Sequence, residues 1–296
     1  MENFSHTKRI RIISPSGVIE PALIDGAANV FRSWGFDVSE GKFAREVYGR
    51  FAGTEAQRIQ DLLEAINDKD LMAILCSRGG YGLAQIVDKI DFSGIEEYPK
   101  WIIGFSDVTI LHAVLSNRNI PSIHGIMAKH LTELPDDTIS RKNLREILLG
   151  NNPIYSIPSD SLNRLGHANG KLIGGNLSVL SGLRGSKYDL DYHDAILFIE
   201  DIGEQPYHID RMMQNFRLSG IFSQLSGLIV GSFTNCTEDP LMHKNIKEII
   251  LSATHAHDFP VCFGFPSGHE EINYPLILGK RVSLAVSADT TILDFN

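Results

Sequence analysis

The chain has 296 residues, of which 43% are hydrophobic and 21% are charged, a composition typical of globular proteins that bury a core without disulfides or structural metals. Its formal net charge of −9 argues against nucleic-acid binding and against binding to anionic membranes, since both need basic surfaces. The cysteines Cys76, Cys236 and Cys262 are widely spaced and form no CxxC pair, so we expect neither a disulfide framework nor a zinc site.

The start of the chain carries no recognisable targeting segment. Residues 1–8 are polar, and Arg11 interrupts the apolar run that follows. A signal peptide needs roughly 7–15 apolar residues and a membrane helix about 18, and the sequence has no such stretch. We therefore expect a soluble, cytoplasmic protein with two domains or one large one.

The first 130 residues alternate between strand and helix patterns. The helix after Thr54 is indicated by a capping box with Gln57 and by apolar residues three and four positions apart. We expect strands at 9–13, 36–39, 71–76, 101–103 and 120–124, and helices at 22–34, from 54, at 83–90 and at 108–115. This alternation predicts a parallel sheet with helices on both faces.

The second half has a more mixed pattern, which suggests a second domain. The polar stretch 135–164 is the predicted linker between domains at 1–134 and 165–296, with a possible short helix at 142–149. Beyond it we expect strands at 171–173, 195–199, 228–233 and 260–263, helices after 176, from 207 and at 245–254, and a hairpin of 281–286 with 290–295.

Three loops rich in glycine or serine, at 14–17, 77–82 and 104–107, follow predicted parallel strands, where ligands bind in open sheets. Ser106 lies at a strand–helix junction, where unpaired N–H groups and the helix dipole favour an oxyanion. Its segment is similar to a nucleophile elbow but lacks the second glycine of G-x-S-x-G. The alternative is that Ser106 is an N-cap.

A serine nucleophile needs a base and an acid that orients the base. His112 and His124 are near Ser106 in sequence, but His112 lies too far along the expected helix to reach it. His269 lies in a turn-rich loop, where it is either a catalytic base or an exposed histidine. Glu200 and Asp201 end an apolar strand, and position alone does not choose between them as the acid.

Other chemistries have weaker signals. The pair His255 and His257 is more typical of a solvated turn than of a metal site. The glycines of 79–82 lack the spacing of a dinucleotide-binding loop, and no Walker lysine follows them. We therefore expect no metal and no cofactor.

Taken together and in order, these segments resemble the LD-carboxypeptidase family of serine peptidases, also called muramoyl-tetrapeptide carboxypeptidases. The matching pieces are 14–17, 51–54 with Arg58, 77–82, 104–107, 124–127, 174–177, 198–201, 206–211 and 264–269. Ile126 and Ser267 depart from the family's usual residues, which bears on fine substrate preference rather than on the chemistry.

The resemblance implies a triad of Ser106, Glu200 and His269. It also implies an oxyanion hole of backbone amides from Gly80 (or Gly79) and Asp107. Arg78 is our candidate for binding the substrate carboxylate, and a salt-bridged loop residue is the alternative.

The fold implied by the resemblance is a flavodoxin-like parallel sheet followed by a smaller mixed β/α domain, with the site between them. The implied reaction is release of terminal D-alanine from murein tetrapeptides in peptidoglycan recycling, by a possible homodimer. The alternatives are a microcin-immunity peptidase that cleaves peptidyl or aminoacyl nucleotides, and a non-catalytic α/β binding protein.

Overall fold

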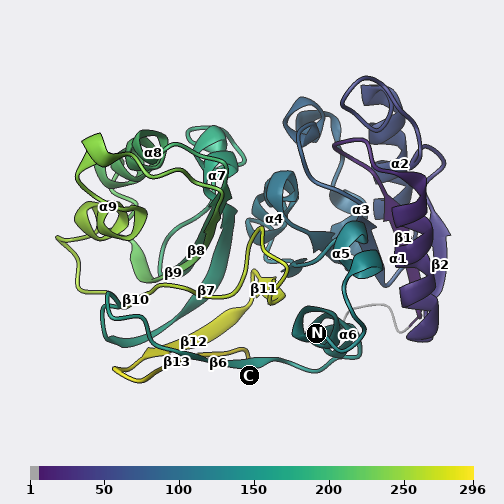
Figure 1. The fold of residues 1–296 in the computed structure, drawn as a ribbon. Coiled ribbons are helices and arrows are strands. Elements are labelled where there is room, and N and C mark those ends of the chain that lie inside the picture. Colours follow the sequence, from purple (N-terminus) through teal and green to yellow (C-terminus); the bar gives the residue numbers. More distant parts are fainter. Residues whose placement is uncertain (1–6) are drawn as a thin grey trace.

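The first half of the chain is built on a six-stranded sheet in the order β11-β5-β4-β3-β1-β2 (Figure 1). The computed structural model describes residues 7–296. The strands are β1 (Arg9–Ile13), β2 (Asp37–Glu40), β3 (Ala73–Cys76), β4 (Trp101–Gly104), β5 (Ser122–His124) and β11 (Leu276–Leu278). Strands β1 to β5 are parallel and follow the flavodoxin-like order 2-1-3-4-5, as predicted, while β11 adds to β5 antiparallel.

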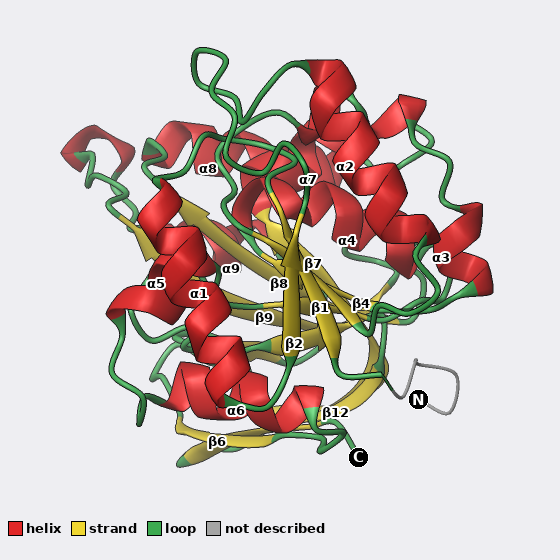
Figure 2. Ribbon diagram, turned by 90° about the vertical axis from the view of Figure 1, so that its right-hand side faces the viewer, coloured by secondary structure: helices red, strands yellow, loops and turns green. Residues whose placement is uncertain are grey.

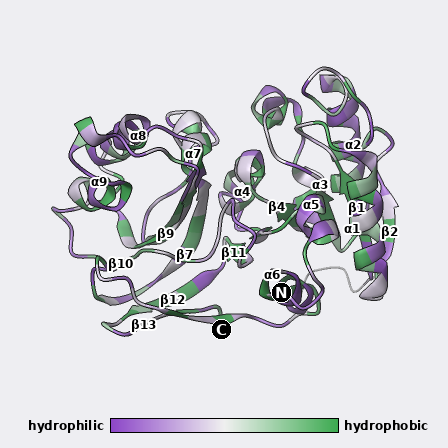
Figure 3. Ribbon diagram, viewed as in Figure 1, coloured by the Kyte–Doolittle hydropathy of each residue, from purple (hydrophilic) through white to green (hydrophobic). Residues whose placement is uncertain are grey.

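Helices cover both faces of this sheet, with α1 and α5 on one side and α2 and α3 on the other (Figure 2). Alternate residues of β1 explain this: Ile12 packs in the cluster with Phe31 of α1, and Ile13 packs in the cluster with Leu62 of α2. The hydrophobic colour is clear on β4 in Figure 3, a strand whose four residues are all buried. The helices are α1 (Pro21–Ser33), α2 (Glu55–Asn67), α3 (Ser93–Glu97), α4 (Thr109–Ser116) and α5 (Ala128–Glu133).

The helix predicted at 83–90 is wrong in type. The chain there makes two short 3-10 helices, η1 (Leu83–Gln85) and η2 (Val87–Lys89). Between them Ile86 has φ −122°, which lies outside the helical region and interrupts the helical hydrogen bonds. Its apolar residues are still buried, so the burial pattern does not require a continuous helix.

The second half is built on a seven-stranded sheet in the order β10-β9-β8-β7-β12-β13-β6. Its strands are β6 (Ile154–Pro158), β7 (Gly166–Asn176), β8 (Ala195–Ile202), β9 (Leu225–Thr234), β10 (Val261–Cys262), β12 (Arg281–Val286) and β13 (Thr290–Asp294). The first four in the sheet are parallel and the rest antiparallel, including the predicted hairpin of β12 with β13. Helices α7 (Leu177–Leu183), α8 (Pro206–Leu218) and α9 (Ile246–Ala253) cover its parallel part (Figure 1).

The two halves exchange elements. The predicted linker contains α6 (Ile139–Leu148) and β6, which pairs with β13 in the second sheet. The chain later returns to the first sheet as β11. One hydrophobic cluster also joins residues of both halves, from Ile13 to Phe263. The domain boundaries at 134 and 165 stay a prediction.

The carboxyl ends of β4 and β7 meet where the halves touch. Thr109 opens α4, and its hydroxyl oxygen accepts a 3.0 Å hydrogen bond from the backbone N–H of Asn176 at the end of β7. This hydrogen bond holds the segment after β4 next to the segment before α7. Within residues 7–296 the structure contains no helix with the length and apolar character needed to cross a bilayer.

Candidate active site

Ser106 follows β4 in a strained turn. Its φ is 65°, a left-handed conformation that costs a non-glycine residue roughly 1–2 kcal/mol and is typical of nucleophile elbows. The N-cap alternative is wrong, because Ser106 is the first residue of the 3-10 helix η3 (Ser106–Val108) and caps neither η3 nor α4 through its side chain. Within residues 7–296 its hydroxyl makes no hydrogen bond to protein, so it is available to a ligand.

Glu200 and His269 form a hydrogen-bonded pair. The Nδ1 atom of His269 lies 2.7 Å from Oε2 of Glu200, which is fully buried near the end of β8. The other carboxylate oxygen, Oε1, is buried without a hydrogen-bond partner among the described residues. The imidazole of His269 is therefore the hydrogen-bond partner of this buried carboxylate.

Asp201 has different hydrogen-bond partners from Glu200. Its side chain faces the start of α7, where it accepts hydrogen bonds from the Asn176 amide and the Ser178 backbone N–H, both at 2.9 Å. Successive residues of a strand point to opposite faces, so only one of the two carboxylates can face His269. That residue is Glu200.

Ser106 and His269 line one cavity of about 610 Å³, together with Arg78 and Gly80. The ring of Phe105, next to the serine, packs edge to face on the His269 ring with centroids 4.8 Å apart. The serine hydroxyl and the imidazole are not hydrogen bonded to each other in the described structure. Catalytic hydrogen bonds are often long before substrate binds, so this arrangement is compatible with a nucleophile and its base.

Two backbone amides predicted for an oxyanion hole lie beside the serine. Neither the N–H of Gly80 nor that of Asp107 donates a hydrogen bond to another described residue. Gly80 has φ 97°, which only glycine adopts freely, and a Cβ on Gly79 would lie 2.7 Å from the Ser106 Cβ. The glycines therefore let this loop approach the serine closely.

The carboxylate of Asp107 holds the surrounding loops together. It accepts hydrogen bonds from the Ser16 hydroxyl at 2.6 Å and from the Leu83 backbone N–H at 2.9 Å. Burial raises the pKa of this carboxyl, while the Ser16 hydrogen bond lowers it. The three loops after β1, β3 and β4 are thus tied at one point.

Arg78 lines the same cavity and is exposed. Its Nη1 atom donates a 2.6 Å hydrogen bond to the carbonyl oxygen of Val18. No ion pair of Arg78 occurs within the described part of the chain, so the salt-bridged alternative is wrong. The rest of the guanidinium is free to meet an anion.

The other histidines near Ser106 in sequence do not enter this cavity. His112 is buried and bonds the Gly104 carbonyl and the Ser122 hydroxyl through its two ring nitrogens. Burial lowers the pKa of His112 to about 4. His124 is fully buried against Phe198, and burial lowers its pKa further. Among residues 7–296, no three His, Cys, Asp or Glu side chains cluster as metal ligands would.

Comparison with known proteins places this chain in a family. The family model of the LD-carboxypeptidase N-terminal domain matches residues 10–125 of this chain. The model of the LD-carboxypeptidase C-terminal domain matches residues 169–284. A putative carboxypeptidase of Synechocystis is 36% identical over 285 residues, which cover 95% of this chain and 93% of that protein. The chain belongs to the LD-carboxypeptidase family.

Other relatives in the comparison have more specific names. The murein tetrapeptide carboxypeptidase of Pseudomonas aeruginosa is 29% identical, over 93% of this chain and 92% of its own. The crystal structure of muramoyltetrapeptide carboxypeptidase from Oxalobacter formigenes superposes with a TM-score of 0.89 at 26% identity, over 97% and 98% of the two chains. MccF in complex with glutamyl sulfamoyl guanosine has a TM-score of 0.86 at 20% identity, over 99% of both chains, which shows a shared fold.

In this member of the LD-carboxypeptidase family, two residues to which the sequence analysis gave no role support the site. Arg58 is only 2% exposed and donates hydrogen bonds from Nη1 to the carbonyl oxygens of Pro15 and Gly82. Asn273 is fully buried, and its Oδ1 accepts from the Gly268 backbone N–H in the loop that carries His269. Arg58 could have been found from the sequence, because it lies on the apolar face of α2, four residues before Leu62.

We predict that Arg58→Met lowers the free energy of unfolding by about 2 kcal/mol, because it leaves the carbonyl of Pro15 without a donor and removes one of the two donors to the carbonyl of Gly82. Activity should fall as well, since those carbonyls flank the loop that carries Gly80. Urea unfolding and steady-state kinetics measure the two effects. An exposed control, Arg32→Met, should change neither, and an unchanged Arg58→Met would contradict the prediction.

A second prediction concerns the pH dependence of stability. Burial raises the pKa of Asp201 to about 6, above its ordinary 3.8. The folded protein therefore keeps this proton to a higher pH than the unfolded chain, so its contribution to stability falls as the pH rises from about 4 to 6. Relative to Asp201→Asn, the wild type should lose on the order of 3 kcal/mol over this window in urea unfolding. Parallel curves for the two proteins would contradict this.

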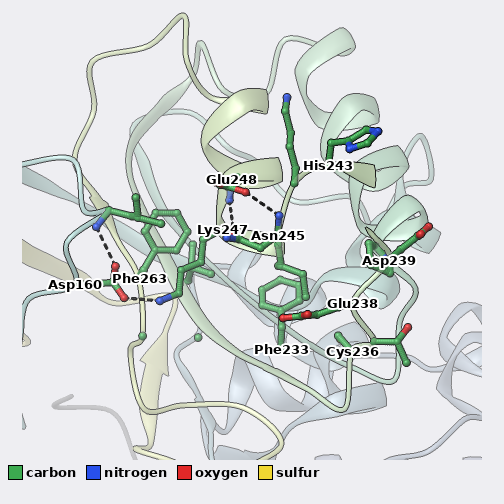
Figure 4. Close-up of a pocket in the computed structure, with 18 of the residues that line it drawn as sticks. Asp160, Phe233, Cys236, Glu238, Asp239, His243, Asn245, Lys247, Glu248 and Phe263 are labelled. Carbon is green, nitrogen blue, oxygen red and sulfur yellow. Dashed lines mark hydrogen bonds and ion pairs between the residues drawn. The ribbon is translucent and has the colours of Figure 1, made fainter. Parts of the chain in front are cut away.

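A larger cavity of about 810 Å³ lies at the ends of β9 and β10 (Figure 4). Phe233, Phe263 and the start of α9 line it, and Lys247 forms an ion pair there with Asp160. Asn245 and Glu248 cap α9 reciprocally, so the helix terminus is already satisfied. None of the proposed triad residues lines this second cavity.

Proposed function

We propose that the protein is a serine carboxypeptidase that hydrolyses the L,D-peptide bond before the terminal D-alanine of murein tetrapeptides. One observation carries the proposal: His269, hydrogen bonded to the buried Glu200, lines the same cavity as Ser106, which lies in a strained turn. Names of relatives such as murein tetrapeptide carboxypeptidase support the substrate. A cytoplasmic role in peptidoglycan recycling follows as part of the same proposal.

In the proposed mechanism His269 takes the proton of the Ser106 hydroxyl as the oxygen attacks the scissile carbonyl. Glu200 holds Nδ1 of the imidazole, which leaves Nε2 to face the serine, and stabilises the imidazolium that forms. His269 then gives the proton to the departing amine of D-alanine. Water attacks the acyl-enzyme with His269 as base, which releases the tripeptide and restores Ser106.

The N–H groups of Gly80 and Asp107 are proposed to bind the oxyanion of each tetrahedral intermediate. Loss of one such donor typically costs about 3–4 kcal/mol of transition-state stabilisation. The loop that carries Gly80 is fixed before reaction, because the Arg58 guanidinium and the Asp107 carboxylate hold its end at Gly82 and Leu83. Arg78, with free guanidinium donors at the cavity, is the first candidate to contact the terminal carboxylate of the substrate.

The test is release of free D-alanine from L-Ala-γ-D-Glu-diaminopimelate-D-Ala by the purified protein. We expect release from this tetrapeptide, and much less from a diastereomer that ends in L-alanine. Glutamyl sulfamoyl guanosine, the ligand named with the MccF structure, serves as a competing substrate. Cleavage of the nucleotide conjugate alone would favour the microcin-immunity activity, and no cleavage of either would favour a non-catalytic protein.

A further inference from the structure

His130 is a cavity-lining histidine that the proposed mechanism does not use. It lies on α5, is half-buried, and packs edge to face on the Phe105 ring with centroids 5.7 Å apart. The same Phe105 ring contacts His269, so the two imidazoles lie on one aromatic side chain. Within residues 7–296 the His130 ring nitrogens form no hydrogen bond, so they can serve a ligand in the cavity.

The packing of α5 fixes the direction of this side chain. Ala128 and Leu131 are buried, and the Thr132 hydroxyl donates a 2.9 Å hydrogen bond to the Leu23 carbonyl of α1. The remaining face of the helix, with Lys129, His130 and Glu133, therefore lines the cavity. A helix anchored on one side in this way can hold a binding residue precisely enough to select a ligand group.

The chemistry of the leaving group says what lies next to His269. The base must return its proton to the amine nitrogen of the departing residue, so that residue lies on the His269 side of Ser106. In a C-terminal amino acid, a single carbon atom separates that nitrogen from the carboxylate carbon. The carboxylate is therefore held close to His269, on the side of the cavity where His130 lies.

We propose that His130, assisted by the charge of Lys129, binds the C-terminal carboxylate of the substrate and so restricts the enzyme to terminal residues. This inference rests on the proposed function. The cavity does not bind every anion, because it also carries negative charge: Nζ of Lys129 lies 3.9 Å from Oε2 of Glu133, and Glu20 also lines the cavity. Selection of a carboxylate then rests on the His130 N–H donor placed beside the Lys129 charge, and not on an excess of positive charge over the whole cavity.

The protonation of His130 is compatible with this role. Burial lowers the pKa of His130, and the nearby charge of Lys129 lowers it further. A neutral imidazole keeps one N–H donor, which a carboxylate oxygen can accept. Arg78, in the loop that carries Gly80, is the alternative residue for binding the same carboxylate.

The experiment compares two substrates that differ only at the C-terminus: the tetrapeptide with a free D-alanine carboxylate and its carboxamide. We expect the wild type to prefer the acid in kcat/KM, and His130→Ala to lose about tenfold to a hundredfold on the acid but little on the amide. His130→Gln retains an N–H donor and should restore part of the preference. His193→Ala, an exposed histidine on a surface turn, is the matched control and should behave as wild type.

Three results would overturn the inference. One is an equal loss on acid and amide in His130→Ala, which would indicate a structural role. Another is an unchanged preference in His130→Ala together with its loss in Arg78→Ala, which would assign the carboxylate to Arg78. The third is no D-alanine release from the tetrapeptide by wild type, which would overturn the proposed function and this inference with it. Thermal unfolding of each variant confirms that it is folded.

Discussion

Replacing Ser106 by alanine is expected to reduce D-alanine release by a factor of about 10⁴ or more. The hydroxyl is the only proposed nucleophile, and loss of a nucleophilic serine leaves only the contribution of substrate binding and oxyanion stabilisation. The measurement is kcat on the tetrapeptide, with the exposed Ser33→Ala as the control. Activity within tenfold of wild type in Ser106→Ala would refute the proposed nucleophile.

The same position offers a stability test that separates strain from chemistry. Ser106 has φ 65°, and alanine keeps the Cβ that makes this conformation costly. Ser106→Gly should therefore be more stable than Ser106→Ala by about 1 kcal/mol, although both are inactive. Equal unfolding free energies would show that the turn is not strained in solution.

The second large effect is expected from Glu200→Gln, with a loss in kcat of about 10³–10⁴-fold. The amide has nearly the same shape but no charge, so it cannot stabilise the imidazolium of His269 and can stabilise the wrong tautomer. KM should change far less than kcat, because Glu200 is buried behind His269 and does not line the cavity. Steady-state kinetics on the tetrapeptide give both constants.

Asp201→Asn is the matched control for Glu200→Gln, since it makes the same chemical change one residue away. Asp201 faces Asn176 and Ser178 rather than His269, so its main effect should be on stability and not on kcat. An equal loss of kcat in both variants would mean that the two carboxylates act together. A normal kcat in Glu200→Gln would remove it from the triad.

Most of the parallel strands could be predicted from the sequence, because each is a short apolar run bounded by turn residues. β1 was predicted with its observed bounds, and β4 differs by one residue. The short antiparallel strand β11 could not be predicted. Its three residues carry no period, and they become a strand only because the edge of β5 is there to pair with them.

The candidate site shows the same division between local and distant information. The loops with Gly80 and Ser106 are visible in the sequence because tight turns need particular residue types. The choice between Glu200 and Asp201 was open from position alone, because it depends on which face of β8 meets a loop 69 residues further on. His130 and Asn273 were missed, since their surroundings come from elements distant in sequence.

The return of the chain to the first sheet as β11 affects how the protein can be divided. β11 follows the His269 loop directly and covers the edge of β5, while β10 before that loop belongs to the second sheet. A fragment that ends at residue 134 would leave the β5 edge unpaired, and exposed edges promote aggregation. The base is thus held between anchors in both halves, so a hinge motion that separated them would have to strip β11 from its sheet. Fragment complementation would therefore need the second fragment to supply β11 to the edge of β5.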